Sequence, residues 1–210
     1  MSVSADSGQA SSPRAAGRGR ALRQRQRILD AAEKCFIESG FHAATMAHIA
    51  ATAKISPGLI YRYFASKSAI VRAIIERHLA CDGCRVVDEG DASQSLCDGL
   101  LDVFECWQRG ANPKINAALM LELTAESTRD PELAEFIRGQ DRMVGKSLAA
   151  RVQREAKARG VQLTAAAARG RAVILQCLVE GLASRAVRDP TLRRQTLRPV
   201  LEQVLAALMR

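Results

Sequence analysis

The sequence predicts an all-α protein made of a compact three-helix unit followed by a larger helical body. Aromatic residues are only 4% of the chain, whereas alanine and leucine, which favour helices, are abundant. Apolar residues recur at helical spacing through most of the chain. No segment alternates apolar and polar residues convincingly, as a half-buried strand would.

The compact unit begins with a helix that Gly40 ends, because glycine adopts the left-handed C-terminal conformation without steric cost. A second helix follows, and Thr45 is positioned to cap it. Each helix has one apolar face at helical spacing. The first face contains Ile28, Leu29, Ala32, Cys35 and Phe36, and the second contains Met46, Ile49, Ala50 and Ala53.

A third helix follows a tight turn at Lys54-Ile55, and its outer face is small at the start and then basic and aromatic. Ser56 is positioned to cap this helix, and Pro57 fits its first turn, where a missing N–H costs nothing. Ile60 and Phe64 lie one turn apart and face inward. A helix-turn-helix inserts the start of its second helix into the major groove, so small residues there allow close approach. The outer side carries Gly58, Leu59, Arg62 and Tyr63.

This segment resembles the DNA-binding part of the TetR family of bacterial one-component regulators. Many fixed spacings hold at once, through Ile28-Leu29, Ala31-Ala32, Phe36, Gly40-Phe41, Thr45, Ile49-Ala50, Ala53, Ser56, Gly58, Tyr61, Phe64 and Lys67. The resemblance implies a homodimer with a helix-turn-helix DNA-binding head, here residues 21–80, and a ligand-binding and dimerisation body, here residues 81–210. By position it implies phosphate contacts at Thr45, Tyr61, Tyr63 and Lys67, and contacts at or near base edges at Pro57, Gly58, Leu59 and Arg62.

Two residues depart from the family pattern. Ala47 stands where some members carry a long polar contact residue, so the second helix is expected to read less of the DNA sequence. Lys54 replaces the common glycine of the turn, so the backbone of that turn must suit a residue with a side chain.

Positive charge is concentrated in the N-terminal part of the chain. The net charge is +9; residues 1–80 hold 12 Lys and Arg against 5 Asp and Glu, and residues 81–210 hold 19 against 17. A positive field at the helix-turn-helix suits a protein that binds phosphates. Residues 1–20 are predicted to be a disordered basic arm, because they lack large apolar residues. This arm either follows the DNA backbone or minor groove, or is a loose tail that adds only nonspecific attraction.

Beyond Ile70 a helix continues to about Leu79 and links the head to the body. Arg129-Asp130-Pro131 is predicted to form a turn, Gly160 to end a long helix, and Thr164 to cap the next. The body helices are expected at about 93–109, 113–128, 131–159 and 165–188, with a last one opened by Pro190.

The last two helices are predicted to form the dimer interface. Small and apolar residues in the first allow close approach, and the second has a continuous apolar stripe. Paired across a two-fold axis they would form a four-helix bundle; the alternative is that both stripes pack inside the monomer. The segment VEGLASRAVRDP is similar to a C-terminal motif of AcrR- and BetI-like family members. The interface candidates are Val173, Cys177, Gly181, Leu197, Leu201, Val204 and Leu208.

A ligand cavity is expected among the central helices if the family resemblance holds, and such pockets are mostly apolar with a few polar anchors. Glu122 and Glu126 lie one turn apart, and either face a cationic ligand or pair with Arg129 or solvent. The candidate lining residues, most of which also suit an ordinary core, are Leu100, Phe104, Trp107, Leu119, Glu122, Leu123, Met143 and Gln176.

A metal- or thiol-redox-sensing regulator is the alternative function. His78, Cys81 and Cys84 are spaced by three, so two thiolates and an imidazole could hold zinc, or the cysteines could form a redox pair. A single CxxC is a weak signal, and no metal or other cofactor is predicted. The other cysteines are expected to be small core residues, and they are Cys35, Cys97, Cys106 and Cys177.

Several other classes of protein do not fit the sequence. No glycine-rich phosphate loop follows a strand, and no nucleophile, base and orienting group can be assembled, so the chain is not expected to be an enzyme. It has no run of 18 apolar residues and no secretory signal, so it is expected in the cytoplasm. The sequence therefore predicts a dimeric transcriptional regulator, a repressor that a small, largely apolar ligand releases from a palindromic operator.

Overall fold

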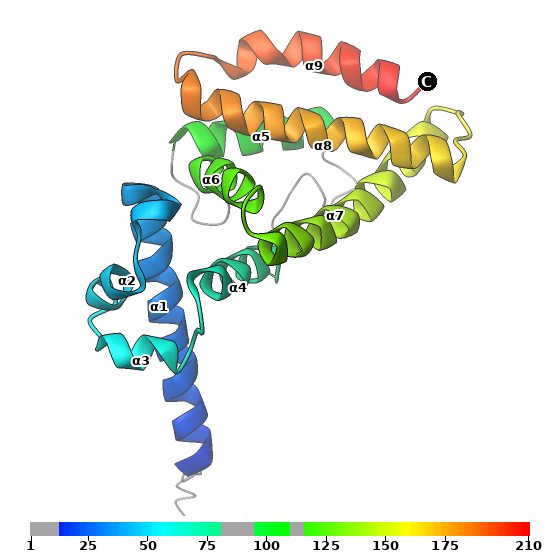
Figure 1. Cartoon of the computed structure of the whole chain (residues 1–210). Coiled ribbons are helices and arrows are strands. Elements are labelled where there is room, and N and C mark those ends of the chain that lie inside the picture. The colour runs from blue at the N-terminus through cyan, green and yellow to red at the C-terminus, as the bar shows by residue number, and fades with distance from the viewer. Residues whose placement is uncertain (1–12, 81–94, 110–115) are drawn as a thin grey trace, which may run out of the picture.

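The computed structural model describes residues 13–80, 95–109 and 116–210, and every regular element within them is a helix (Figure 1). The all-α prediction is therefore confirmed for this part of the chain. Helices α1 to α3 form the head, α4 connects it to the body, and α5 to α9 form the body. The helices are α1 (Pro13–Ala43), α2 (Met46–Thr52), α3 (Pro57–Tyr61), α4 (Lys67–Ala80), α5 (Leu96–Arg109), α6 (Ala117–Ser127), α7 (Pro131–Ala158), α8 (Ala165–Arg188) and α9 (Arg194–Leu208).

The first helix begins earlier than the sequence predicts. Residues 13–20 belong to α1 and not to a disordered arm; residues 1–12 lie outside the described residues. Proline suits the first turn of a helix, and the arginines and alanines that follow favour it, although Gly17 and Gly19 do not; the segment continues directly into the packed part of α1. In Figure 1 the start of α1 projects beyond α3, away from the body.

Gly40 separates the main part of α1 from its last turn, close to the predicted end of the helix. Its φ of 78° lies in the left-handed region, which glycine enters easily because it has no Cβ. The chain bends there, and the Phe41 ring packs against the Phe36 ring with 5.2 Å between their centroids.

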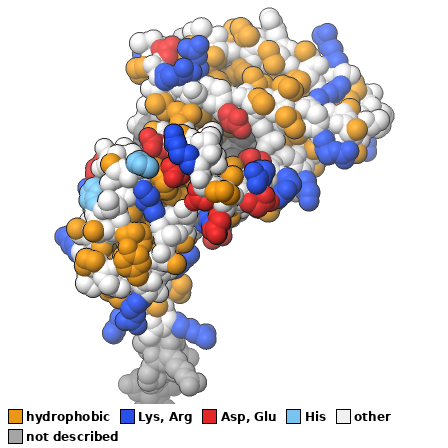
Figure 2. All heavy atoms as spheres, in the orientation of Figure 1, with side chains coloured by type: hydrophobic (Ala, Val, Ile, Leu, Met, Phe, Trp, Pro, Cys, Tyr) orange, Lys and Arg blue, Asp and Glu red, His pale blue; other side chains and the backbone are white. Residues whose placement is uncertain are grey.

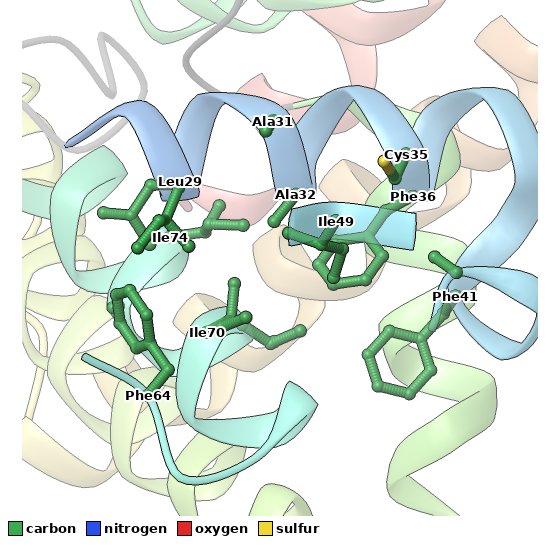
Figure 3. Close-up of a cluster of buried hydrophobic side chains, with 14 of the residues drawn as sticks. Leu29, Ala31, Ala32, Cys35, Phe36, Phe41, Ile49, Phe64, Ile70 and Ile74 are labelled. Atoms are coloured by element: carbon green, nitrogen blue, oxygen red, sulfur yellow. The ribbon is translucent and has the colours of Figure 1, made fainter. Parts of the chain in front are cut away.

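Helices α1 to α4 share one hydrophobic core, in which side chains from α1, α2 and α4 point toward one another (Figure 3). Leu119 and Leu123 of α6 and Leu133 of α7 belong to the same cluster of buried residues. Each fully buried leucine, isoleucine or phenylalanine side chain contributes about 1.5–3 kcal/mol to folding. The head therefore packs directly against the body through α6 and α7.

A second core joins α5, α7, α8 and α9, with Phe104 at 0% exposure among its largest members. At its edge Arg194 and Arg198 of α9 both form ion pairs with Asp98 of α5, at 3.1 and 2.5 Å, and Arg194 also pairs with Asp102. These ion pairs join α9 to α5.

Side-chain caps set the starts of the body helices. Thr164 caps α8, as predicted; Asp130, predicted only as part of a turn, caps α7, and Asn116 caps α6. The last helix begins at Arg194 and not at Pro190. The reason is that the Asp189 carboxylate accepts hydrogen bonds from the backbone and hydroxyl of Thr191, at 3.1 and 2.7 Å, which makes a turn. No helix among the described residues is long and apolar enough to span a membrane.

Candidate DNA-binding head and ligand cavity

The turn between α2 and α3 has the geometry of a helix-turn-helix. Thr45 caps α2 as predicted, because its hydroxyl accepts a hydrogen bond of 3.1 Å from the backbone N–H of His48. Helix α2 ends where the N–H of Ile55 donates to the carbonyl of Ala50 at 3.0 Å. This closure requires a left-handed residue, and Lys54 supplies it with a φ of 55°. It is the position where the family commonly has glycine.

Helix α3 presents the outer face that the sequence predicts. Pro57, Gly58 and Arg62 are exposed, and 58% of Tyr61 is accessible to solvent. A Cβ at Gly58 would meet nothing within 4 Å, so this part of the surface is open. Leu59 and Tyr63 are half-buried, while Ile60 and Phe64 point into the core. Ser56 occupies the N-cap position, but its side chain makes no capping hydrogen bond.

Two arginines that precede the apolar face of α1 connect that helix to the helix-turn-helix. The Arg27 guanidinium donates to the carbonyl of Ala53, at the end of α2, at 2.8 Å. The Arg25 guanidinium lies over the Phe64 ring, 5.1 Å from its centroid. Arg18, Arg20 and Arg23 are exposed on the projecting part of α1. Figure 2 shows Lys and Arg side chains at this lower end of the head.

Lys67 also has a structural role that the sequence does not reveal. Its ammonium donates to the carbonyls of Phe41 and His42, at 2.6 and 3.3 Å, and lies 4.2 Å from the centroid of the Phe41 ring. Burial lowers the pKa of Lys67 from its ordinary value, although the charge of Glu126 opposes this effect. These contacts use two of the three ammonium donors.

A cavity of about 510 Å³ lies between α4, α6, α7 and α8. Its apolar wall includes Leu119 and Leu123, both predicted, together with Ile74, Ile75 and Ile137. Its polar wall includes Asp141 of α7 and Glu180 of α8. Neither carboxylate was predicted from the sequence, because nothing local indicates that these two positions face the same cavity.

The other predicted lining residues do not line this cavity. Leu100, Phe104 and Trp107 are buried in the core of the body, because α5 packs against α8 and α9. Met143 is exposed to solvent. Gln176 instead donates a hydrogen bond to the backbone carbonyl of Asp141 at 3.1 Å, which joins α8 to α7.

Glu122 contacts the head and not the cavity. Its carboxylate accepts a hydrogen bond of 2.9 Å from the backbone N–H of Phe41, directly after the bend at Gly40. One turn later, Glu126 lies 3.9 Å from the imidazole of His42. Both acidic residues of α6 therefore contact the end of α1, a partner that the sequence did not indicate, and Glu122 also remains exposed to solvent.

Some of the predicted interface residues are exposed on the last two helices, and others are buried or half-buried in the core of their own chain. Val173, Cys177 and Gly181 of α8 are exposed, as is Val204 of α9. Leu201 is only 6% exposed and packs in the core of its own chain, so its place in a dimer interface is a wrong prediction. Leu197 and Leu208 are half-buried against the same core. These leucines are buried or half-buried because the apolar face of α9 packs against α5 of the same chain.

The cysteines divide between core and surface. Cys35 and Cys97 are buried and Cys106 is half-buried, but Cys177 is exposed and not a core residue. Cys81 and Cys84 lie outside the described residues, and so does the His78 side chain. Over the parts of the chain that the structure describes, no group of three or more His, Cys, Asp or Glu residues could hold a metal ion.

Comparisons with known proteins agree with this architecture. Residues 28–74 match the family of bacterial regulatory proteins, tetR family, and residues 108–210 match the C-terminal part of the BetI-type transcriptional repressors. The chain is 34% identical over 145 residues to the HTH-type transcriptional regulator UidR of Escherichia coli strain K12, an alignment covering 65% of this chain and 67% of that protein.

Solved structures give the same result. Salmonella enterica GusR superposes with a TM-score of 0.71 and 28% identity, over 96% of this chain and 99% of that one. The SmeT–triclosan complex superposes with a TM-score of 0.66 and 26% identity, over 88% of this chain and 91% of that one. The two family matches and UidR are transcriptional regulators and not enzymes. The two family matches, the identity to UidR and the helix-turn-helix head together show that the chain belongs to the TetR family of DNA-binding transcriptional regulators.

Proposed function

We propose that this regulator is a homodimeric repressor that binds a palindromic operator and that a small, largely apolar ligand releases from it. The observation that carries the proposal is the position of α6. This helix lines the cavity through Leu119 and Leu123 and contacts the end of α1 through Glu122 and Glu126. The same short helix therefore connects the cavity to the head.

The proposed DNA contacts divide into positioning and reading residues. Thr45, Tyr61, Tyr63 and Lys67 would bind phosphates, which fix the orientation of the head without carrying sequence information. Pro57, Gly58, Leu59 and Arg62 would lie at or near base edges in the major groove. The open surface at Gly58 and the exposure of Arg62 support this division.

The proposed homodimer would use the exposed sides of α8 and α9. Val173 is 55% and Val200 59% exposed, which leaves apolar surface in contact with water in the single chain. Two copies related by a two-fold axis would cover these surfaces in one four-helix bundle. The two heads would then bind inverted half-sites of one duplex.

Release follows if the ligand binds more tightly to the conformation in which the heads do not fit the operator than to the one in which they do. The cavity is bounded by α4 and α6, and both helices pack against α1. A ligand that fills the cavity best when these helices have shifted would move the heads away from the spacing of the operator. Its wall suits a largely apolar compound, and the related SmeT has been solved with triclosan.

The proposal is tested by selecting duplexes from a random pool with the full-length protein and measuring fluorescence anisotropy on the selected sequence. We expect an inverted repeat, an affinity that falls steeply with salt because counterions are released, and repression of a reporter whose promoter overlaps that sequence. A selected site without two-fold symmetry would contradict the dimer, and activation of the reporter would contradict repression.

A pair of variants separates the two kinds of contact. Tyr61→Phe should weaken binding to the selected and to a random duplex equally, because phosphates are the same in both. Leu59→Ala should instead relax the preference at one or two base pairs. The assignment is wrong if Tyr61→Phe changes the selected sequence while its affinity for random duplex stays the same.

A further inference from the structure

We infer that the cavity between α4, α6, α7 and α8 takes an organic cation, with an apolar body against the isoleucines and leucines and a positively charged, hydrogen-bond-donating head at Asp141 and Glu180. This inference rests on the proposed function of the cavity as the effector site and adds the charge class of the ligand.

The two carboxylates face one cavity and repel each other. Neither Asp141 nor Glu180 has an ion-pair partner among the described residues. Both remain accessible to solvent, yet partial burial raises the pKa of Asp141; burial and then the charge of Asp141 raise the pKa of Glu180. A bound cation would remove this repulsion, and a bound anion would increase it.

The rest of the polar wall offers acceptors more than donors. The hydroxyl hydrogens of Thr124, Ser127 and Thr128 are all donated to backbone carbonyls of α6, at 2.9, 2.8 and 2.7 Å. The oxygens of these hydroxyls keep lone pairs that can accept. The Oε1 atom of Gln140 is buried without a hydrogen-bond partner and belongs to another lining residue. A ligand with N–H groups would satisfy such acceptors.

The two carboxylates of the wall outnumber its one guanidinium. Arg138 lines the cavity, and its guanidinium donates twice to the Glu135 carboxylate, at 3.1 and 2.7 Å, while the same carboxylate also accepts from Arg142 at 3.0 Å. Asn116 and Gln140 add neutral amides. The charge that the wall presents to a ligand is therefore negative, while its shape and the residues Ile74, Leu119 and Ile137 suit an aliphatic or aromatic body.

Three compounds of the same chain length and different charge test this inference: octylamine, octanol and octanoate. Isothermal titration calorimetry on the full-length protein near neutral pH should give octylamine an affinity at least about tenfold higher than octanol, because its ammonium gains charge-assisted hydrogen bonds. Octanoate should bind most weakly. Equal affinities of amine and alcohol, tighter binding of octanoate, or no binding of the amine would overturn the inference.

Substitutions of the two carboxylates test whether they cause the preference for octylamine over octanol. Asp141→Asn and Glu180→Gln should each reduce the affinity for octylamine by about threefold to tenfold and the affinity for octanol by clearly less, and the remaining octanol binding shows that the cavity is intact. The double variant should bind amine and alcohol equally. Glu202→Gln, which removes a carboxylate of α9 that pairs with Arg198, is the matched control and should behave like the wild type. A preference that persists in the double variant would overturn the assignment to these two residues.

Operator release is measured separately, by anisotropy on the selected duplex. If octylamine binds with the expected preference but leaves the DNA complex intact, ligand release is wrong and the charge class of the cavity stands. If octanol releases the operator as effectively as octylamine, release stands and the inference fails.

Discussion

At the scale of single residues, the helix-turn-helix contains one backbone conformation that its residue does not favour. Lys54 has a φ of 55°, a region that L-residues occupy at a cost of about 1–2 kcal/mol and that β-branched residues rarely enter. The sequence indicates that this position is unusual, because Lys54 replaces the glycine common in the family. It does not reveal that the lysine keeps the glycine-like conformation.

The first prediction concerns this turn. Lys54→Val should lower the free energy of unfolding by about 1–2 kcal/mol, because a β-branched side chain clashes in the left-handed region. Lys54→Gly should stay within about 1 kcal/mol of the wild type, since relief of strain and the higher entropy of the unfolded chain oppose each other. Urea unfolding of both variants measures the difference. Equal stability of the valine and glycine variants would contradict the assigned backbone conformation.

Contacts that the sequence predicts correctly join near neighbours, and contacts that it does not reveal join residues far apart in the chain. Thr45 caps α2 by accepting a hydrogen bond from the backbone N–H of the third residue after it, so the local sequence pattern is enough to predict this contact. Lys67 bonds to a carbonyl 26 positions away and Glu122 to an amide 81 positions away. Periodicity places such a side chain on a face of its helix and cannot say which other helix comes to lie against that face.

At the scale of elements, α6 contacts the head and α7 contacts the connecting helix α4 through a few polar contacts, in addition to the buried leucines that they share with that core. The carboxylate of Glu122 accepts from the end of α1, and that of Asp130, at the start of α7, accepts from the hydroxyl of Ser68 in α4 at 2.6 Å. Arg72 of α4 also pairs with Glu132 of α7 at 2.5 Å. Because the cavity lies between these helices, their contacts with the head are where ligand binding would be transmitted.

The second prediction tests the contact made by α6. Glu122→Ala leaves the Phe41 N–H without its acceptor and should lower the free energy of unfolding by about 1–2 kcal/mol. Ligand affinity should change little, since Glu122 lies outside the cavity, but the ligand should reduce operator affinity less than in the wild type. Glu122→Gln keeps an acceptor and serves as the control. Calorimetry and anisotropy on the same preparations separate the two effects, and an unchanged ligand response in Glu122→Ala would rule out this route.

The third prediction is the pH dependence of the junction between α4 and α7. The hydrogen bond from Ser68, followed by the backbone N–H of Leu133, holds the pKa of Asp130 below its ordinary value of 3.8. A carboxylate with a lowered pKa stabilises the fold above the unfolded value, and this contribution disappears as the pH falls through the folded value. Asp130→Ala should therefore cost about 1 kcal/mol near neutral pH, as for a lost helix cap, and progressively less below about pH 4.

Asp130→Asn is the control for this experiment, because asparagine also caps helices but does not titrate. Its stability should be closer to that of the wild type and should lack this acid-dependent component. Urea unfolding at a series of pH values measures both variants. A cost of Asp130→Ala that is the same at neutral and acidic pH would show that charge at this cap is irrelevant.

At the scale of the whole molecule, the fold class and the head follow from the sequence more reliably than the surfaces of the body. The helix-turn-helix is a local motif with fixed spacings, so its residues identify it. The final helix shows an amphipathic pattern, but this pattern does not distinguish a face buried in its own chain from one covered by a second chain. Leu201 and Val200 are adjacent in sequence, yet Leu201 is 6% exposed in the single chain and Val200 is 59% exposed.

The last prediction uses this pair of neighbours. Leu201→Arg would place an unpaired charge in the core formed with α5, at a cost of several kcal/mol, and should unfold the body. Val200→Arg changes an exposed side chain, so the single chain should keep its helical circular dichroism. In the proposed dimer, however, the arginine is buried against the partner, so the protein should sediment as a monomer. One head then makes half of the contacts, and operator affinity should fall by more than tenfold at the same salt concentration. A Val200→Arg protein that sediments as a dimer and binds the operator normally would show that the two chains meet on another surface.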